Sequence, residues 1–318
     1  MKLNTLYETV VKKGLKEDQR SKKKIEDSLK KVKKEYRKAK GIDKATFDRE
    51  SLKHPYDDTR ILNASGNPEI KTVMMGIDID VSEILMAERL REKGVKIDLV
   101  ISHHPSGRAL ANLHKVMAIQ PGIWEKYGLS KEVAEGIMKD RIEQVARGVA
   151  PSNHTKTADA AKILGIPFMC THTPADNCVA NYLQKLFDSR KPRKLKNVVS
   201  LLKRIPEYKG AMENNAGPFI LVGKEDSDAG KIFVDMTGGT SGPDKMLSRL
   251  SQAGVKTMVG MHCKESAYKA AGSEFINYVI AGHMASDTLG MNLLYDAVEK
   301  KGKLKFIECS GFRRIRRK

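Results

Sequence analysis

The sequence has no long apolar run and few cysteines. No segment approaches the ~18 consecutive apolar residues of a membrane-spanning helix, and the N-terminal stretch MKLNTLYETVVKKGLKEDQ lacks the apolar core of a secretory signal. The four cysteines, Cys170, Cys178, Cys263 and Cys309, show neither CxxC spacing nor the density of a disulfide scaffold. These absences argue against a membrane protein and a disulfide-rich secreted protein, and we expect a reduced, cytoplasmic one.

Several functional motifs are also missing. The sequence contains no GxxxxGK[ST] phosphate loop, no GxSxG nucleophile elbow, no zinc finger, no recognisable helix-turn-helix and no RNP-type aromatic pattern. The stretch DMTGGTSGPDK, residues 235–245, places glycines before a predicted helix and could cradle a phosphate there. Without the full motif, a simple turn is the preferred interpretation.

Positive charge is abundant and unevenly distributed. The net charge is +19, and three segments are rich in Lys and Arg: residues 1–40, residues 190–204 (RKPRKLKNVVSLLKR) and the final RRIRRK. A basic surface attracts polyanions, so nucleic acid and a small anionic substrate are candidate partners. The alternative is a solvated charged face without a specific partner.

The pattern of apolar residues predicts an α/β protein of two similar lobes. Residues 1–50 form a basic helical extension, in which two apolar stripes (Leu3, Leu6, Val10; then Ile25, Leu29, Val32, Tyr36, Ala39) predict a helical hairpin that lies on the body or on another subunit. Strand and helix patterns then alternate over 55–190 and again over 205–318, and we expect 190–204 to be a linker or exposed surface.

The first lobe begins with a strand–helix–strand unit. The strands are predicted at 71–79 and 97–102, and the helix between them at 82–94, capped by Ser82 and closed by Gly94. Such a unit predicts two parallel strands joined by a right-handed crossover.

Four of the eight histidines, His103, His104, His172 and His283, lie at or just past the end of a predicted apolar strand. Sites in open α/β sheets gather at this end of the strands. Asp176 and Asp287 follow His172 and His283 by four residues, a spacing that puts two side chains on one helical face. Imidazoles with carboxylates suit zinc, iron or manganese, and two ions with a bridging carboxylate would activate a water and polarise a carbonyl or phosphoryl oxygen. The alternative is four structural histidines and no metal.

Three stretches resemble the Nif-three-like family, also known as GTP cyclohydrolase 1 type 2 homologues. They are VMMGIDIDVSEILMAERLREKGVKIDLVISHHP, IPFMCTHTPADNCVANYL and VKTMVGMHCKESAYKAAGSEFINYVIAGHMASDTLGMNLL, and they occur in the family's order over most of residues 71–318. The resemblance implies a ring-shaped homohexamer and a pair of divalent transition-metal ions between the lobes. It further implies the ligands His103, His104, Asp176, His283 and Asp287, with His172 as an adjacent catalytic group. Asp287 stands where the family usually has Glu, and Gly260-Met261 stands where Gly-Glu is common.

Two functions are compatible with these residues. The first is a metal-dependent hydrolase, in which a hydroxide on the metal attacks an amide, amidine or phosphoester of a nucleotide-like or other small anionic substrate, and His172 relays a proton. The second is a non-catalytic metal-handling or scaffold protein that binds nucleic acid or protein through its basic surface. Five protein ligands would leave open positions on two ions, and open positions favour catalysis.

Overall fold

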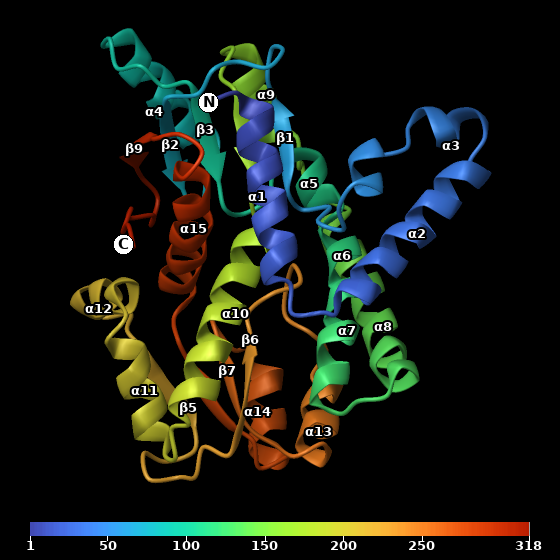
Figure 1. Cartoon of the computed structure of the whole chain (residues 1–318), viewed down its shortest axis with the longest axis vertical. Coiled ribbons are helices and arrows are strands. Elements are labelled where there is room, and N and C mark those ends of the chain that lie inside the picture. Colours follow the sequence, from blue (N-terminus) through green and yellow to red (C-terminus); the bar gives the residue numbers. More distant parts are fainter. Residues whose placement is uncertain (318) are drawn as a thin grey trace.

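Two similar sheets lie at opposite ends of the computed structural model, which describes residues 1–317 (Figure 1). The first sheet has the order β1-β4-β3-β2-β9, from the strands Arg60–Asn63, Phe168–Cys170, Leu99–Ser102, Thr72–Gly76 and Lys305–Glu308. The second has the order β5-β8-β7-β6, from Phe219–Val222, Asn277–Ile280, Val255–Gly260 and Lys231–Asp235.

The two sheets repeat one topology. Each contains three parallel strands, β2-β3-β4 or β6-β7-β8, and an antiparallel strand with a register irregularity, β1 or β5, borders the last of them. The first sheet has β9 as a fourth parallel strand, next to β2. The inner strands β2 and β3 are buried on both faces, which explains their continuous apolar sequences TVMMG and LVIS. The predicted parallel strand–helix–strand unit and the pair of similar α/β lobes are confirmed.

Three helices form the middle of the molecule. α10 (Thr173–Arg190) follows β4 and α15 (His283–Glu299) follows the equivalent strand β8, so the two helices correspond in the repeat. They pack closely on each other, and α1 (Leu3–Glu17) packs on both (Figure 1). The remaining helices of the two sheets are α4 (Val81–Glu92), α9 (Lys156–Ile163), α11 (Leu195–Lys203), α12 (Pro206–Glu213), α13 (Lys245–Gln252) and α14 (Glu265–Ser273).

The predicted lobe boundaries need two corrections. The last strand, β9, leaves the predicted second lobe and pairs with β2, where it covers the edge of a fully buried strand. The helical stretch after His104 lies in the predicted first lobe, yet its later part shares a hydrophobic core with the second sheet through Met117, Trp124 and Met138. That stretch contains α5 (Gly107–Ala111), α6 (Leu113–Val116), η2 (Met117–Ile119), α7 (Gln120–Trp124), η3 (Glu125–Tyr127) and α8 (Lys131–Val149).

The N-terminal segment divides into a buried helix and a projecting part, whereas the sequence predicted a single helical extension. α1 is part of the core: Leu3, Leu6 and Val10 are fully buried, and the Asn177 side-chain amide of α10 donates to the Gly14 carbonyl. α2 (Lys22–Lys38) projects from the body and is followed by the short helix α3 (Gly41–Ala45). The chain then returns to the body through η1 (Arg49–Leu52) (Figure 1). On α2, Ile25 is the one residue of the predicted stripe that is buried.

Two further expectations are wrong at the level of single residues. Residues 190–204 are not a linker, because α11 buries Leu195, Val198, Val199 and Leu202 in a core. Helix α4 is capped by Asp80 in a capping box with Glu83, so it begins before the predicted cap Ser82. No helix within residues 1–317 is long and apolar enough to cross a membrane.

The contact between α1 and α10 depends on Gly14. A Cβ atom at this position would lie 2.7 Å from Cβ and 2.9 Å from Cα of Pro174, so the two helices could not keep their spacing. We expect Gly14→Ala to lower the free energy of unfolding by about 1–3 kcal/mol, the usual cost of overpacking, in urea denaturation. Gly136→Ala is the matched control: nothing lies near its added Cβ on α8, and it should stabilise by about 0.5–1 kcal/mol. Equal effects of the two substitutions would contradict the close packing.

Candidate metal centre

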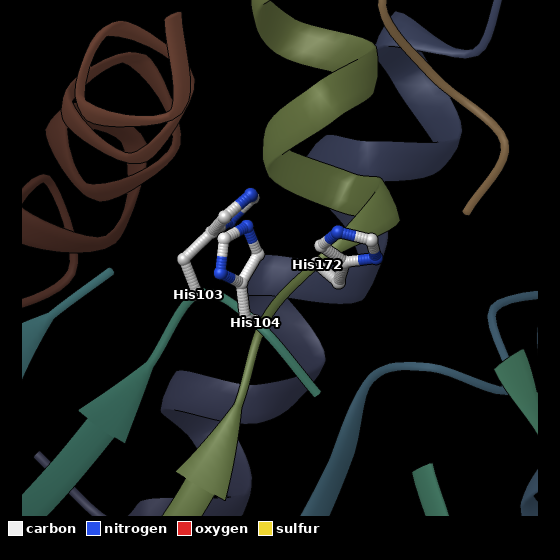
Figure 2. Close-up of side chains that lie close together, drawn as sticks. All are labelled: His103, His104 and His172. Carbon is white, nitrogen blue, oxygen red and sulfur yellow. The ribbon is translucent and has the colours of Figure 1, made fainter. Parts of the chain in front are cut away.

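The histidine pair of the first lobe continues the backbone ladder beyond β3. The N–H groups of His103 and His104 donate to the carbonyls of Gly76 and Ile77, both at 3.0 Å. This pairing carries the two residues past the end of the strand and brings their rings to a centroid distance of 5.1 Å. His172 follows β4, and its ring lies 4.8 Å from that of His103 (Figure 2). Three rings from two neighbouring strands thus meet at one edge of the first sheet.

The helices α10 and α15 bring two carboxylates to the same place. Asp176 lies in the first turn of α10, and its Oδ1 is 3.3 Å from Nε2 of His103. Asp287 lies one turn into α15, where its Oδ1 is 3.4 Å from Nε2 of His103. Its Oδ2 is 3.5 Å from Nε2 of His104 and 3.4 Å from Nε2 of His283. The predicted pairing of His283 with Asp287 across one helical turn is therefore present.

Each of the three clustered histidines is held by its Nδ1 atom. His103 donates from Nδ1 to the Thr171 carbonyl at 3.1 Å. His104 pairs with Asp78 at 2.6 Å, and His172 pairs with the fully buried Asp58 at 2.8 Å. An acceptor at Nδ1 fixes the ring so that Nε2 faces the carboxylates, and in the neutral imidazole Nε2 then carries the free electron pair, the usual arrangement of a metal-ligating histidine.

Asp58 and Asp78 were not identified from the sequence. Asp78 lies just past β2, in the acidic segment GIDID, and its position at a strand end is a signal that could have singled it out. Asp58 lies in the loop 53–59, where nothing in the sequence distinguishes it from Asp57. It reaches His172 because β1, the antiparallel edge strand, pairs with β4 and returns that loop to the end of the sheet.

Four buried polar atoms in the cluster have no hydrogen-bond partner: Nε2 of His103, Oδ1 of Asp176 and both carboxylate oxygens of Asp287. A buried carboxylate without a partner is costly, and here two of them face the free nitrogens of imidazoles. This donor set fits divalent cations, which would satisfy these four atoms. Three groups of residues could each hold an ion, because the ligand atoms within each group lie within 4.8 Å of one another. The groups are His103–His104–His172, His104–His283–Asp287 and His103–Asp176–Asp287. All six predicted site residues are therefore brought together, and these groups could hold metal ions.

The pKa shifts of the cluster indicate a negative local potential, which attracts positive charge as protons or as a cation. Burial alone would lower the pKa of His103, but the carboxylates of Asp287 and Asp176 outweigh it and raise this pKa well above its ordinary value. Burial would raise the pKa of Asp287, whereas His103 and His104 hold it far below its ordinary value. The carboxylate of Asp287 therefore stays ionised, and a cation competes with protons for the imidazoles.

A cavity of about 330 Å³ opens onto the cluster from the side of the second lobe. His104, His172 and Asp287 line this cavity, and so does most of the segment 235–244. In this segment Gly238 and Gly239 have φ values of +93° and +85°, and the Gln120 side chain donates to the carbonyls of Gly238 and Thr240 at 2.8 and 2.7 Å. The glycine-rich stretch is thus a turn that forms part of the cavity wall.

The comparisons with known proteins agree with this architecture. The sequence matches no protein-family model and no curated protein. The structure of a NIF3 superfamily protein from Sphaerobacter thermophilus matches with a TM-score of 0.70 and 27% sequence identity, over 80% of this chain and 91% of that chain. Reduced HcgD from Methanocaldococcus jannaschii (16% identity, 84% of this chain and 94% of that chain) and a protein from Thermus thermophilus (15%, 80% and 89%) match with TM-scores of only 0.46 and add nothing to the argument. With the repeated sheets and the motifs at their strand ends, the match to the Sphaerobacter protein supports a NIF3-like assignment for this chain.

Proposed function

We propose that this chain is a metal-dependent hydrolase with two cations. The observation that carries the proposal is the shared Asp287. One of its oxygens faces His103, beside Asp176, and the other faces His104 and His283. Two groups of potential ligands, His103–Asp176–Asp287 and His104–His283–Asp287, therefore have one carboxylate in common. The shorter Asp in place of the family's usual Glu is still long enough to face both groups.

Two neighbouring divalent cations of zinc, iron or manganese type would lower the pKa of a bound water and polarise a carbonyl or phosphoryl oxygen. The protein supplies three ligand residues for each position, which leaves room for water and substrate. The cavity beside the cluster has the size of a small-molecule site. Hydrolysis of an amide, an amidine or a phosphoester is the reaction class that such a site supports.

His172 is suited to hold and move a proton in this reaction. Its Nδ1 is fixed by Asp58, and its Nε2 lies 3.8 Å from Oδ2 of Asp176, farther than the distances within the two ligand groups that share Asp287. Burial lowers the pKa of His172, but Asp176 and Asp58 outweigh burial and raise it. A histidine whose ring is held in place beside the cavity can protonate a leaving group.

A second candidate function is binding of nucleic acid by the projecting helix α2. Three of the four C-terminal arginines are not free to bind a polyanion, since Arg314, Arg316 and Arg317 pair with Asp296, Glu299 and Glu207. Within the described part of the chain, only two cations of α2 have an ion-pair partner, Lys24 with Glu125 and Lys30 with Asp27. The unpaired ones are Lys22, Lys23, Lys31, Lys33, Lys34, Arg37 and Lys38. Such a concentration of free charge on one exposed helix suits a phosphate backbone.

The shared carboxylate predicts how single substitutions change metal content. Protein purified without chelator should contain close to two transition-metal ions per chain by elemental analysis. Asp287→Ala should lose nearly all of the metal, because both positions lose a ligand, whereas His283→Ala should lose about half. His172→Ala should retain both ions, and His114→Ala is the control outside the cluster. Equal metal content in Asp287→Ala and the unmodified protein would contradict the proposal, and loss in His172→Ala would make His172 a ligand.

The role of Asp58 can be tested in metal-free protein. Asp58→Asn removes a carboxylate that raises the pKa of His172, while the burial that lowers it remains, so this pKa should fall in an NMR titration of the imidazole ring. The raised pKa of His172 stabilises the fold most below the ordinary histidine pKa and loses its effect as pH rises through the raised value. Asp58→Asn should therefore lower the free energy of unfolding mainly at pH values below the ordinary histidine pKa. Asp226→Asn, at an exposed ion pair with Lys196, is the control, and an unchanged pKa of His172 would refute the assignment.

Binding by α2 can be tested with two variants of equal net charge. In Lys31→Gln/Lys33→Gln/Lys34→Gln/Lys38→Gln, we expect weaker binding of a fluorescent single-stranded oligonucleotide by anisotropy. The slope of log K against log salt should fall by about 3. The control replaces four exposed lysines elsewhere, Lys96, Lys162, Lys209 and Lys301. Equal weakening by both variants would show that only overall charge matters.

A further inference from the structure

Asp235 is a carboxylate in the wall of the cavity that the mechanism above does not use. Asp235 is the last residue of β6, and in the sheet it lies opposite Gly260 of β7. Its side chain lines the same cavity as His104, Asp176 and Asp287. A molecule that fills the cavity can therefore contact Asp235 as well as the candidate metal ligands.

Asp235 has neither a hydrogen bond nor an ion pair from another side chain within residues 1–317. Burial raises the pKa of this carboxyl to about 6. Two donors that line the same cavity serve other acceptors: the Tyr278 hydroxyl donates to the His262 carbonyl at 3.2 Å, and Lys264 pairs with Asp244 at 3.0 Å. Asp235 is half-buried and faces the cavity, so its free carboxylate can accept from a ligand that brings a donor.

The surroundings of Asp235 indicate the shape of such a ligand. Methionines line this part of the cavity: Met236, Met246, Met258 and Met261. Their thioethers adapt to flat rings and make favourable contacts with aromatic edges. Among the residues that line the cavity, Asp235 and Asp244 carry two negative charges and Lys264 a single positive one. These three residues together do not favour an anion, although the whole chain carries a charge of +19.

We propose that Asp235 recognises the nitrogen edge of the substrate, a flat apolar ring with adjacent N–H donors, as in an aminated heterocycle or an aryl amidine. Two parallel N–H groups match the two oxygens of a carboxylate, while the ring lies among the methionines. The proposal rests on the hydrolase function for the identity of the ligand as substrate. It refines the expected anionic substrate: a negative group would lie at the cation end, and the ring and its N–H donors at Asp235.

The test uses the metal-loaded protein and two probes that differ only at the donor edge, 2-aminobenzimidazole and 2-methylbenzimidazole. By isothermal titration calorimetry, the wild-type protein should bind the amino compound at least about tenfold more tightly, the usual effect of a charge-assisted pair. Asp235→Asn should reduce this preference to about twofold or less and leave the binding of the methyl compound unchanged. Asp244→Asn is the matched control in the same wall and should keep the preference.

The outcomes separate this proposal from the hydrolase function. Equal binding of the two probes to the wild-type protein, or an undiminished preference in Asp235→Asn, would overturn the role of Asp235. The metal content of every variant is measured in parallel, and Asp235→Asn should retain all of it. If chelator-treated protein keeps the preference, that result supports Asp235 independently of the metals, even if no hydrolysis is found.

Discussion

The two carboxylate oxygens of Asp287 are the constraint on which the site depends. They are buried, ionised and without a hydrogen-bond partner, and they face three imidazoles from two lobes. Such a group is stable in a protein interior only with positive charge close by. Protonated His103 can supply that charge in metal-free protein, and cations would supply it in the loaded one. The geometry of the histidines follows from this requirement.

The repeated fold brings the parts of this cluster together. Equivalent strands, β4 and β8, lead into equivalent helices, α10 and α15, and the two helices begin at the site. They approach so closely that a Cβ on Gly290 would lie 2.5 Å from the Ala175 carbonyl oxygen. Asp176 and Asp287 lie near the positive ends of these helices, where negative charge is favoured. The helix pair therefore stabilises the carboxylates, and the carboxylates offset the repulsion that a cation would meet there.

Positive charge is distributed unevenly between the projecting helix α2 and the cavity, a difference that the composition alone does not show. The C-terminal arginines neutralise Glu207, Asp296 and Glu299 and hold the end of the chain against α12 and α15. Segment 190–204 contributes apolar residues to a core, while the cavity beside the cluster contains more carboxylates than ammonium groups. Unpaired positive charge is concentrated on α2, the helix that projects from the body (Figure 1). Net charge thus predicts little about the chemistry of the cavity.

Local sequence patterns determined the parallel α/β units, the two lobes and the six clustered residues, because strand and helix periodicity and strand-end positions are properties of short segments. Tertiary structure decided what depends on distant pairing. β9 joins the first sheet by pairing with β2, which is far away in the sequence. α1 packs closely on α10 because Gly14 leaves room for Pro174. Asp58 reaches His172 because β1 pairs antiparallel with β4. None of these contacts has a local signature, since each joins residues far apart in the sequence. The same reason hid Asp235, whose unpaired state is visible only once its neighbours are known to serve other partners.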